Sequence, residues 1–276
     1  MSDALIGSRT GFVVELAAGV LTISLDRPEV GNALASEAIP QLGRVFADAA
    51  KRSDVRAVLF RAEGAVFCSG GDIKGFAKSI DQAPEDRYAD YHARMDRARL
   101  QMEAYLDLRV PIVVACQGAV AGAAVAYPLG ADIVLAEPGT RFVFPHQRLG
   151  LPPDGGLSYL LPRVVGFRKA SELVLTAATI NAEEAMRLGI VSRVVATDSL
   201  QVEARSIAER LARAPVGAVR RARALLRDAE NRSVSEQLSA ERDAIAESVA
   251  DPDFEEGVRA FMEKRRPVYP SLGVVG

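Results

Sequence analysis

The stretch Phe67-Cys68-Ser69-Gly70-Gly71-Asp72-Ile73-Lys74 (FCSGGDIK) is the most informative segment of the 276-residue chain. It follows an apolar run at residues 55–60, which is typical of a buried strand. Two adjacent glycines leave backbone N–H groups uncovered and let a ligand approach the backbone closely. Alone, such a turn is more often an ordinary loop than a site, so its meaning depends on its surroundings.

A second turn of similar character covers residues 116–124 (CQGAVAGAA). It joins an apolar run at residues 111–116 to a stretch of small residues that predicts a short helix. The first N–H groups of a helix have no intrahelical acceptor, and the helix dipole adds partial positive charge there. Two such N–H donors that converge would form an oxyanion hole for a carbonyl oxygen.

Farther out, strand and helix patterns predict an α/β protein with a helical C-terminal region. Residues 12–16 and 20–25 predict a hairpin, and a stripe of apolar residues between Tyr88 and Leu106 predicts one long amphipathic helix. The remaining predicted strands are 133–136 and 142–144, and the remaining predicted helices are 36–51, 168–177, 182–188, 199–213, 215–229, 233–249 and 253–265. Strand signals fade from about residue 168. We therefore predict a core at residues 1–200 and a helical region at 201–276.

Composition excludes several classes of function. With 34 basic and 36 acidic residues, two cysteines and two histidines, the chain is not expected to bind nucleic acid, zinc or another metal. The basic run Arg220, Arg221, Arg223 and Arg227 is predicted to be a solvated helix face. Residues 110–131 carry no charge, but they are rich in alanine, glycine and proline and are interpreted as core rather than membrane span. The first residues lack a signal-peptide pattern, so we expect a cytoplasmic protein without a membrane partner.

Taken in order along the chain, these motifs resemble the crotonase superfamily, the enoyl-CoA hydratase/isomerase group. The matching stretches are 25–28 with 32–34, 67–74, 111–118, Gly122, 132–136, 149–156 and 256–265. The resemblance implies a spiral of ββα units followed by a C-terminal helical region that forms trimers. A homotrimer or homohexamer is therefore expected. The implied ligand is an acyl-CoA thioester, so that coenzyme A is part of the substrate and no separate cofactor is expected.

The resemblance also assigns roles to individual residues. The backbone N–H groups of Gly71 and Ala123 would form the oxyanion hole. Small side chains suffice there, because the donors belong to the backbone. The residues implied in binding coenzyme A or substrate are Arg27, Ser69, Gly70, Asp72, Ile73, Lys74, Gly122, Phe261 and Lys264. In the family the last two often come from a neighbouring subunit.

The chain departs from the hydratase pattern at both catalytic carboxylates. Where typical hydratases have two glutamates, this sequence has Ala126 and His146. Hydration needs one group to deprotonate a water and a proton for the α-carbon, so this loss counts against ordinary hydration.

Asp154 is the remaining candidate acid or base. It matches the catalytic aspartate of the ring-opened oxepin and Δ3,Δ2-enoyl-CoA isomerases of phenylacetate-type degradation, and Pro153, Leu157 and Leu160 are expected to bury it. One carboxylate suffices to move a proton between two carbons, so the favoured hypothesis is a double-bond isomerase. Three alternatives stay open: His146 pairs with Asp154 in a hydratase or hydrolase, His146 only shapes the pocket, or the protein binds acyl-CoA without turnover.

Overall fold

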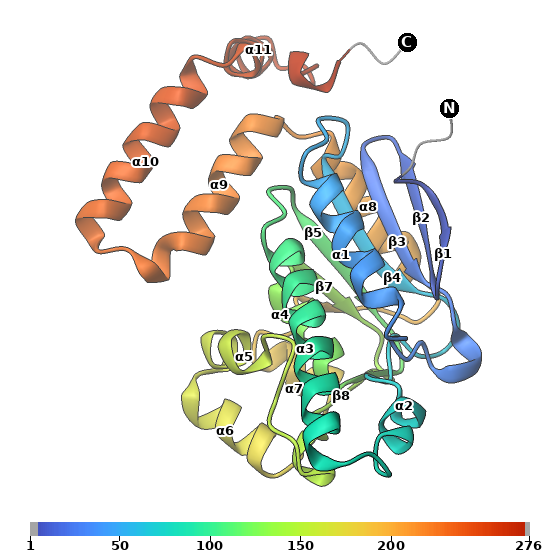
Figure 1. Cartoon of the computed structure of the whole chain (residues 1–276). Coiled ribbons are helices and arrows are strands. Elements are labelled where there is room, and N and C mark those ends of the chain that lie inside the picture. Colours follow the sequence, from blue (N-terminus) through green and yellow to red (C-terminus); the bar gives the residue numbers. More distant parts are fainter. Residues whose placement is uncertain (1–4, 274–276) are drawn as a thin grey trace.

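The computed structural model describes residues 5–273, apart from the side chains of residues 73 and 74 (Figure 1). At its centre is a seven-stranded sheet in the order β1-β2-β3-β4-β5-β7-β10. A three-stranded sheet, β6-β8-β9, lies beside it. The strands are β1 Gly7–Arg9, β2 Phe12–Ala17, β3 Val20–Leu25, β4 Ala57–Ala62, β5 Ile112–Cys116, β6 Ala119–Ala121, β7 Ile133–Ala136, β8 Arg141–Val143, β9 Thr179–Asn181 and β10 Arg193–Val194.

The N-terminal hairpin forms as predicted. Strands β2 and β3 pair antiparallel with Ala17 opposite Val20. The two residues between them, Ala18 and Gly19, have φ of 51° and 81°, as a two-residue turn that follows the twist of its strands requires. From β3 onward the large sheet is parallel, and every residue of β3 is buried. A strand buried on both faces is typical of parallel sheets covered by helices.

Helices cover both faces of the large sheet (Figure 1). The helices of the described residues are α1 Ala38–Ala49, α2 Ile73–Lys78, α3 Pro84–Leu106, α4 Ala126–Gly130, α5 Leu157–Val165, α6 Phe167–Leu175, α7 Ala182–Arg187, α8 Leu200–Ala212, α9 Val216–Asp228, α10 Val234–Val249 and α11 Pro252–Met262. On one face, Leu59 and Val113 pack against α8. On the other, Phe60 and Val114 belong to the core shared with α1 and α3.

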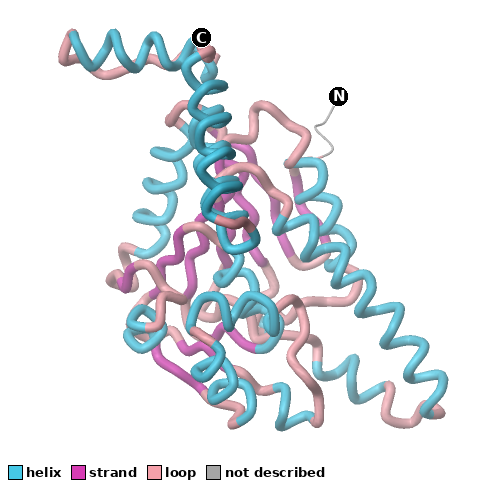
Figure 2. Tube along the Cα trace, turned by 90° about the vertical axis from the view of Figure 1, so that its left-hand side faces the viewer, coloured by secondary structure: helices cyan, strands magenta, loops and turns pink. Residues whose placement is uncertain are grey.

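The last three helices, α9 to α11, form an arm that extends away from the sheet (Figures 1 and 2). The arm is attached at Arg223 of α9, which is buried and forms an ion pair with Asp132 just before β7. The predicted solvated face is therefore wrong at Arg223, because this side chain reaches across to the sheet. No helix in residues 5–273 is both long and apolar enough to cross a bilayer.

The predicted α/β class, the long helix α3 and the helical C-terminal region are confirmed. Two strands, β9 and β10, follow residue 168, although strand signals in the sequence fade there. These strands have three and two residues, which is too short for a recognisable alternation, and each is placed by its partner strand. Helix α5 and strand β6 were also not predicted. The domain boundary near residue 200 and the trimer stay predictions.

Candidate active site

Both glycine turns open into one cavity of about 290 Å³. Its lining includes Gly70 and Gly71 from the first turn, Gly122 and Ala123 from the second, and His146 and Asp154 from the segment after β8. Helix α3 forms a further wall. The structure therefore brings together at one place the segments that carry the predicted catalytic residues and oxyanion donors.

The two turns lie backbone against backbone. Cys68 forms a parallel bridge with Val120 of β6, which fixes the first turn beside the second. Gly70 has φ of 97°, and a Cβ atom there would lie 2.9 Å from the carbonyl oxygen of Ala121. Such a contact is too short for a real Cβ, so only glycine fits. The glycine signal in the sequence thus has a steric cause, the close approach of two backbones.

Two backbone donors at this junction have no acceptor within the described chain. The bridge between Leu34 and Gly71 uses the Leu34 N–H, which donates to the Gly70 carbonyl at 3.0 Å, and leaves the Gly71 N–H unused. Ala123 is the second residue of the 3-10 helix η2 (Gly122–Val125). At that position an N–H has no intrahelical acceptor. Both residues line the cavity, as an oxyanion hole requires.

His146 and Asp154 meet at the cavity wall. Nε2 of His146 lies 3.2 Å from Oδ1 of Asp154. The histidine begins the 3-10 helix η3 (His146–Leu149), and its ring lies beside the second turn, since a Cβ on Gly122 would be 3.8 Å from Nε2. A Cβ on Gly155 would be 3.0 Å from the Ala123 side chain. The pair therefore lies next to the backbone donors.

The surroundings of Asp154 differ from the expectation. Its side chain is 41% exposed, whereas that of His146 is 8% exposed. Gly155 and Gly156 both have positive φ and turn the chain into α5, so that Leu157 and Leu160 enter the core while the carboxylate stays at the cavity. The expected burial of Asp154 is thus wrong. The buried group of the pair is His146, whose Nδ1 has no hydrogen-bond partner in the described chain.

Cys68 is next to the first turn but is not a candidate nucleophile. Complete burial raises the pKa of its thiol to about 12, and Sγ lies 3.1 Å from the carbonyl oxygen of Asn32 as a hydrogen-bond donor. A thiol held in the protonated form is a poor nucleophile. Cys68 is therefore a small buried side chain of the core. No group of three or more His, Cys, Asp or Glu side chains that could hold a metal occurs in residues 5–273.

The predicted residues for coenzyme A binding are scattered. Ser69, Gly70 and Gly122 line the cavity, and Asp72 immediately precedes α2. Arg27 is not part of the lining; its Nη1 donates to the carbonyl of Ala33 at 3.3 Å. The side chains of Ile73 and Lys74 lie outside the described residues. The structure therefore tests none of the phosphate contacts that the resemblance implies.

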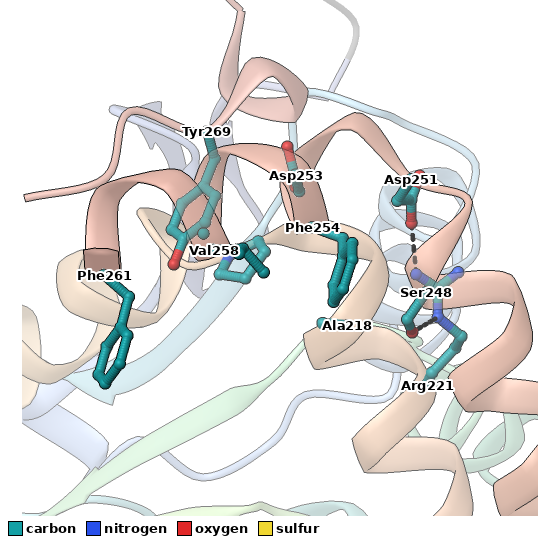
Figure 3. A pocket seen from close by; sticks show the side chains of 11 residues that line it. Ala218, Arg221, Ser248, Asp251, Asp253, Phe254, Val258, Phe261 and Tyr269 are labelled. Atoms are coloured by element: carbon teal, nitrogen blue, oxygen red, sulfur yellow. Dashed lines mark hydrogen bonds and ion pairs between the residues drawn. The ribbon is translucent and has the colours of Figure 1, made fainter. Parts of the chain in front are cut away.

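Phe261 belongs to α11, and Lys264 follows this helix by two residues. Helix α11 lies at the opposite end of the molecule from α2 (Figure 1). Phe261 is 82% exposed and borders a second cavity, of about 430 Å³, between α9, α10 and α11 (Figure 3). Val258 and Tyr269 lie beside it there. Within one chain these residues cannot reach the catalytic cavity. A role in substrate binding would need the arm of another copy, as the resemblance implies.

Sequence reasoning missed two polar residues of the cavity, Arg94 and Gln101. Both lie on α3 within the predicted apolar stripe and are separated by seven residues, which is two helical turns. Their spacing is the signal that could have identified them. Two long polar side chains occur on the helix face that otherwise carries Tyr91, Met95 and Met102.

Comparison with known proteins agrees with this geometry. A family model described as Enoyl-CoA hydratase/isomerase matches residues 15–271. A protein of Rhodobacter capsulatus named "Probable enoyl-CoA hydratase" is 34% identical over 92% of this chain and 95% of its own. The 1,2-epoxyphenylacetyl-CoA isomerase of Escherichia coli is 32% identical over 91% and 95%. The crystal structure of an enoyl-CoA hydratase from Bacillus anthracis has a TM-score of 0.87 at 27% identity and covers 95% of this chain and 100% of that one.

Proposed function

Because the chain belongs to the enoyl-CoA hydratase/isomerase family, we propose that it moves a double bond within an enoyl-CoA thioester, with Asp154 as the proton shuttle. One observation favours isomerisation over hydration. Asp154 is the only carboxylate among the described residues that line the catalytic cavity. The position of one hydratase glutamate is Ala126, a buried residue at the start of α4, and the other is His146.

The proposed reaction needs only one carboxylate. In a 3-enoyl thioester, Asp154 takes a proton from C2, and the electron pair spreads through the chain onto the thioester oxygen. Return of that proton at C4 moves the double bond from C3–C4 to C2–C3. No water is consumed and nothing is oxidised or reduced.

The negative charge of the intermediate falls on an oxygen that the N–H groups of Gly71 and Ala123 would hold. Neither donor has another acceptor among the described residues, so both are available before substrate arrives. Donors oriented in advance contribute on the order of 3 kcal/mol each to such reactions. His146, at 3.2 Å from Oδ1, holds the Asp154 carboxylate toward the same point.

The contact between His146 and Asp154 also favours a second candidate function. A histidine beside a carboxylate is an arrangement that deprotonates water. The same pair would then catalyse hydration of the double bond or hydrolysis of the thioester. Incorporation of labelled oxygen from water into the product distinguishes both reactions from isomerisation, which takes up none.

The deciding experiment compares Asp154→Asn with His146→Gln on 3-enoyl-CoA substrates. Asparagine is nearly isosteric but does not accept the proton, so the rate of Asp154→Asn should fall at least ~10²-fold. Binding of a saturated acyl-CoA, followed by calorimetry, should hardly change. His146→Gln should cost much less. If His146→Gln is inactive and Asp154→Asn is active, Asp154 is not the proton shuttle. If the wild type binds acyl-CoA without turnover, the protein is non-catalytic.

A further inference from the structure

The wall of the catalytic cavity formed by α3 presents a guanidinium group that has no anionic partner among the described residues. The guanidinium carbon of Arg94 lies 5.0 Å from the centre of the Phe76 ring and 5.8 Å from that of Tyr91, two rings that stack on each other with their centres 5.6 Å apart. It makes no hydrogen bond or ion pair with any described residue, and its Nε is buried. The buried Nε–H group therefore lacks the hydrogen bond that usually compensates for lost water.

A second donor on the same wall also has no acceptor. Gln101 is 5% exposed, and its Oε1 lies 3.3 Å from the hydroxyl of Tyr127, from which it accepts a hydrogen bond. Its Nε2 has no partner in the described chain. Between Arg94 and Gln101 the wall consists of apolar side chains such as Met95 and Ala98. A plain hydrocarbon chain in this cavity would satisfy neither donor.

We propose that the acyl group of the substrate carries oxygen beyond the thioester, and that it ends in a carboxylate held by Arg94. The inference rests on the acyl-CoA site of the proposed function and names the class of acyl group. The flat guanidinium matches a carboxylate with two parallel N–H donors. Contact with the Phe76 and Tyr91 rings restricts the Arg94 side chain, which reduces the entropy lost when the carboxylate binds. Gln101 supplies a neutral donor farther along the same wall.

Binding of unreactive thioesters tests this assignment. Saturated acyl-CoA thioesters from butanoyl to decanoyl are each paired with the ω-carboxyl thioester of the same length, and affinities are measured by calorimetry. At one chain length or more, the wild type should bind the carboxylated member more tightly. Arg94→Met, similar in length but uncharged, should reduce that preference roughly 30-fold or more, the scale for removing one partner of a desolvated charge pair.

The control is Arg97→Met, which removes an exposed arginine from the same helix and should keep the preference. If no chain length shows a preference for the carboxylate, or if Arg94→Met retains it, the inference is wrong. Equal weakening of both members of a pair by Arg94→Met would instead place the guanidinium on the phosphates of coenzyme A and also overturn it. Because the thioesters are saturated, this outcome is independent of whether the protein isomerises a double bond.

Discussion

At the scale of single residues, Gly70 shows how the candidate site depends on an absent side chain. Its carbonyl accepts from Leu34, its successor carries a proposed oxyanion donor, and its own Cα lies against the backbone of Ala121. A methyl group at this position would have to push the two glycine turns apart. The distance between the Gly71 and Ala123 N–H groups would then increase.

Gly70→Ala should therefore abolish most turnover, with a loss of about 10²-fold, the scale for removing one oxyanion donor. The matched control is Gly150→Ala. Both glycines have positive φ, at 97° and 69°, but a Cβ at residue 150 would meet nothing within 4 Å. Backbone strain should cost each variant about 1 kcal/mol of stability, and Gly70→Ala should lose more because its methyl group also meets the Ala121 carbonyl. Normal turnover by a folded Gly70→Ala would show that the approach of the two turns does not matter.

At the scale of elements, the end of α11 is held by Glu256. This side chain accepts hydrogen bonds from Arg265 and from the backbone N–H of Val268. These bonds lower the pKa of the Glu256 carboxyl to about 2, the Arg265 side chain being the larger cause. The chain that leaves the helix is thereby folded back against it.

A carboxyl with a lowered pKa stabilises the folded state above its unfolded pKa of about 4.3. That contribution should shrink as the pH falls from about 4.5 through 2. Glu256→Gln should therefore be less stable than wild type at pH 7, and the difference should disappear near pH 2. Urea unfolding followed by circular dichroism at a series of pH values measures it. The control is Glu241→Gln, a substitution at an exposed position on α10. If the stability difference between Glu256→Gln and wild type does not depend on pH, the Glu256 carboxylate does not stabilise the fold through its lowered pKa.

At the scale of the whole molecule, the arm is joined to the sheet through one buried charge. Nε of Arg223 lies 2.9 Å and 2.7 Å from the two carboxylate oxygens of Asp132, and Nη1 donates to the carbonyl of Leu108. Oδ2 of Asp132 also accepts from the N–H of Ile112 at the start of β5. One ion pair thus links α9, β5 and the segment before β7.

Arg223→Met should lower the free energy of unfolding by about 2–3 kcal/mol, because Asp132 would lose its charged partner in a largely buried place. This loss is small for a broken buried ion pair, because the Asp132 side chain is 27% exposed. Urea unfolding measures the change. Arg213→Met, which removes an exposed partner of Glu209, should stay within about 0.5 kcal/mol of wild type. Equal effects of the two substitutions would mean that the buried pair does not attach the arm.

Much of the architecture was accessible from the sequence, because hairpins, long helices and glycine turns depend on neighbours close in the chain. Strand-like apolar runs predicted β2 and β3, and helical spacing predicted α3. The family followed from motifs in order. Short strands such as β9 and β10 could not be predicted, since their partner strands place them rather than their own two or three residues.

By itself, the sequence determined the class of fold, the family and the two turns that carry the backbone donors, since each is encoded in a short run of residues. Only the tertiary structure decided how the side chains of the site are used. It placed the Asp154 carboxylate at the cavity beside His146, left Arg94 without a described anionic partner, and buried Arg223 against Asp132. These outcomes depend on contacts between segments that folding brings together, and residue type and local spacing do not specify such contacts.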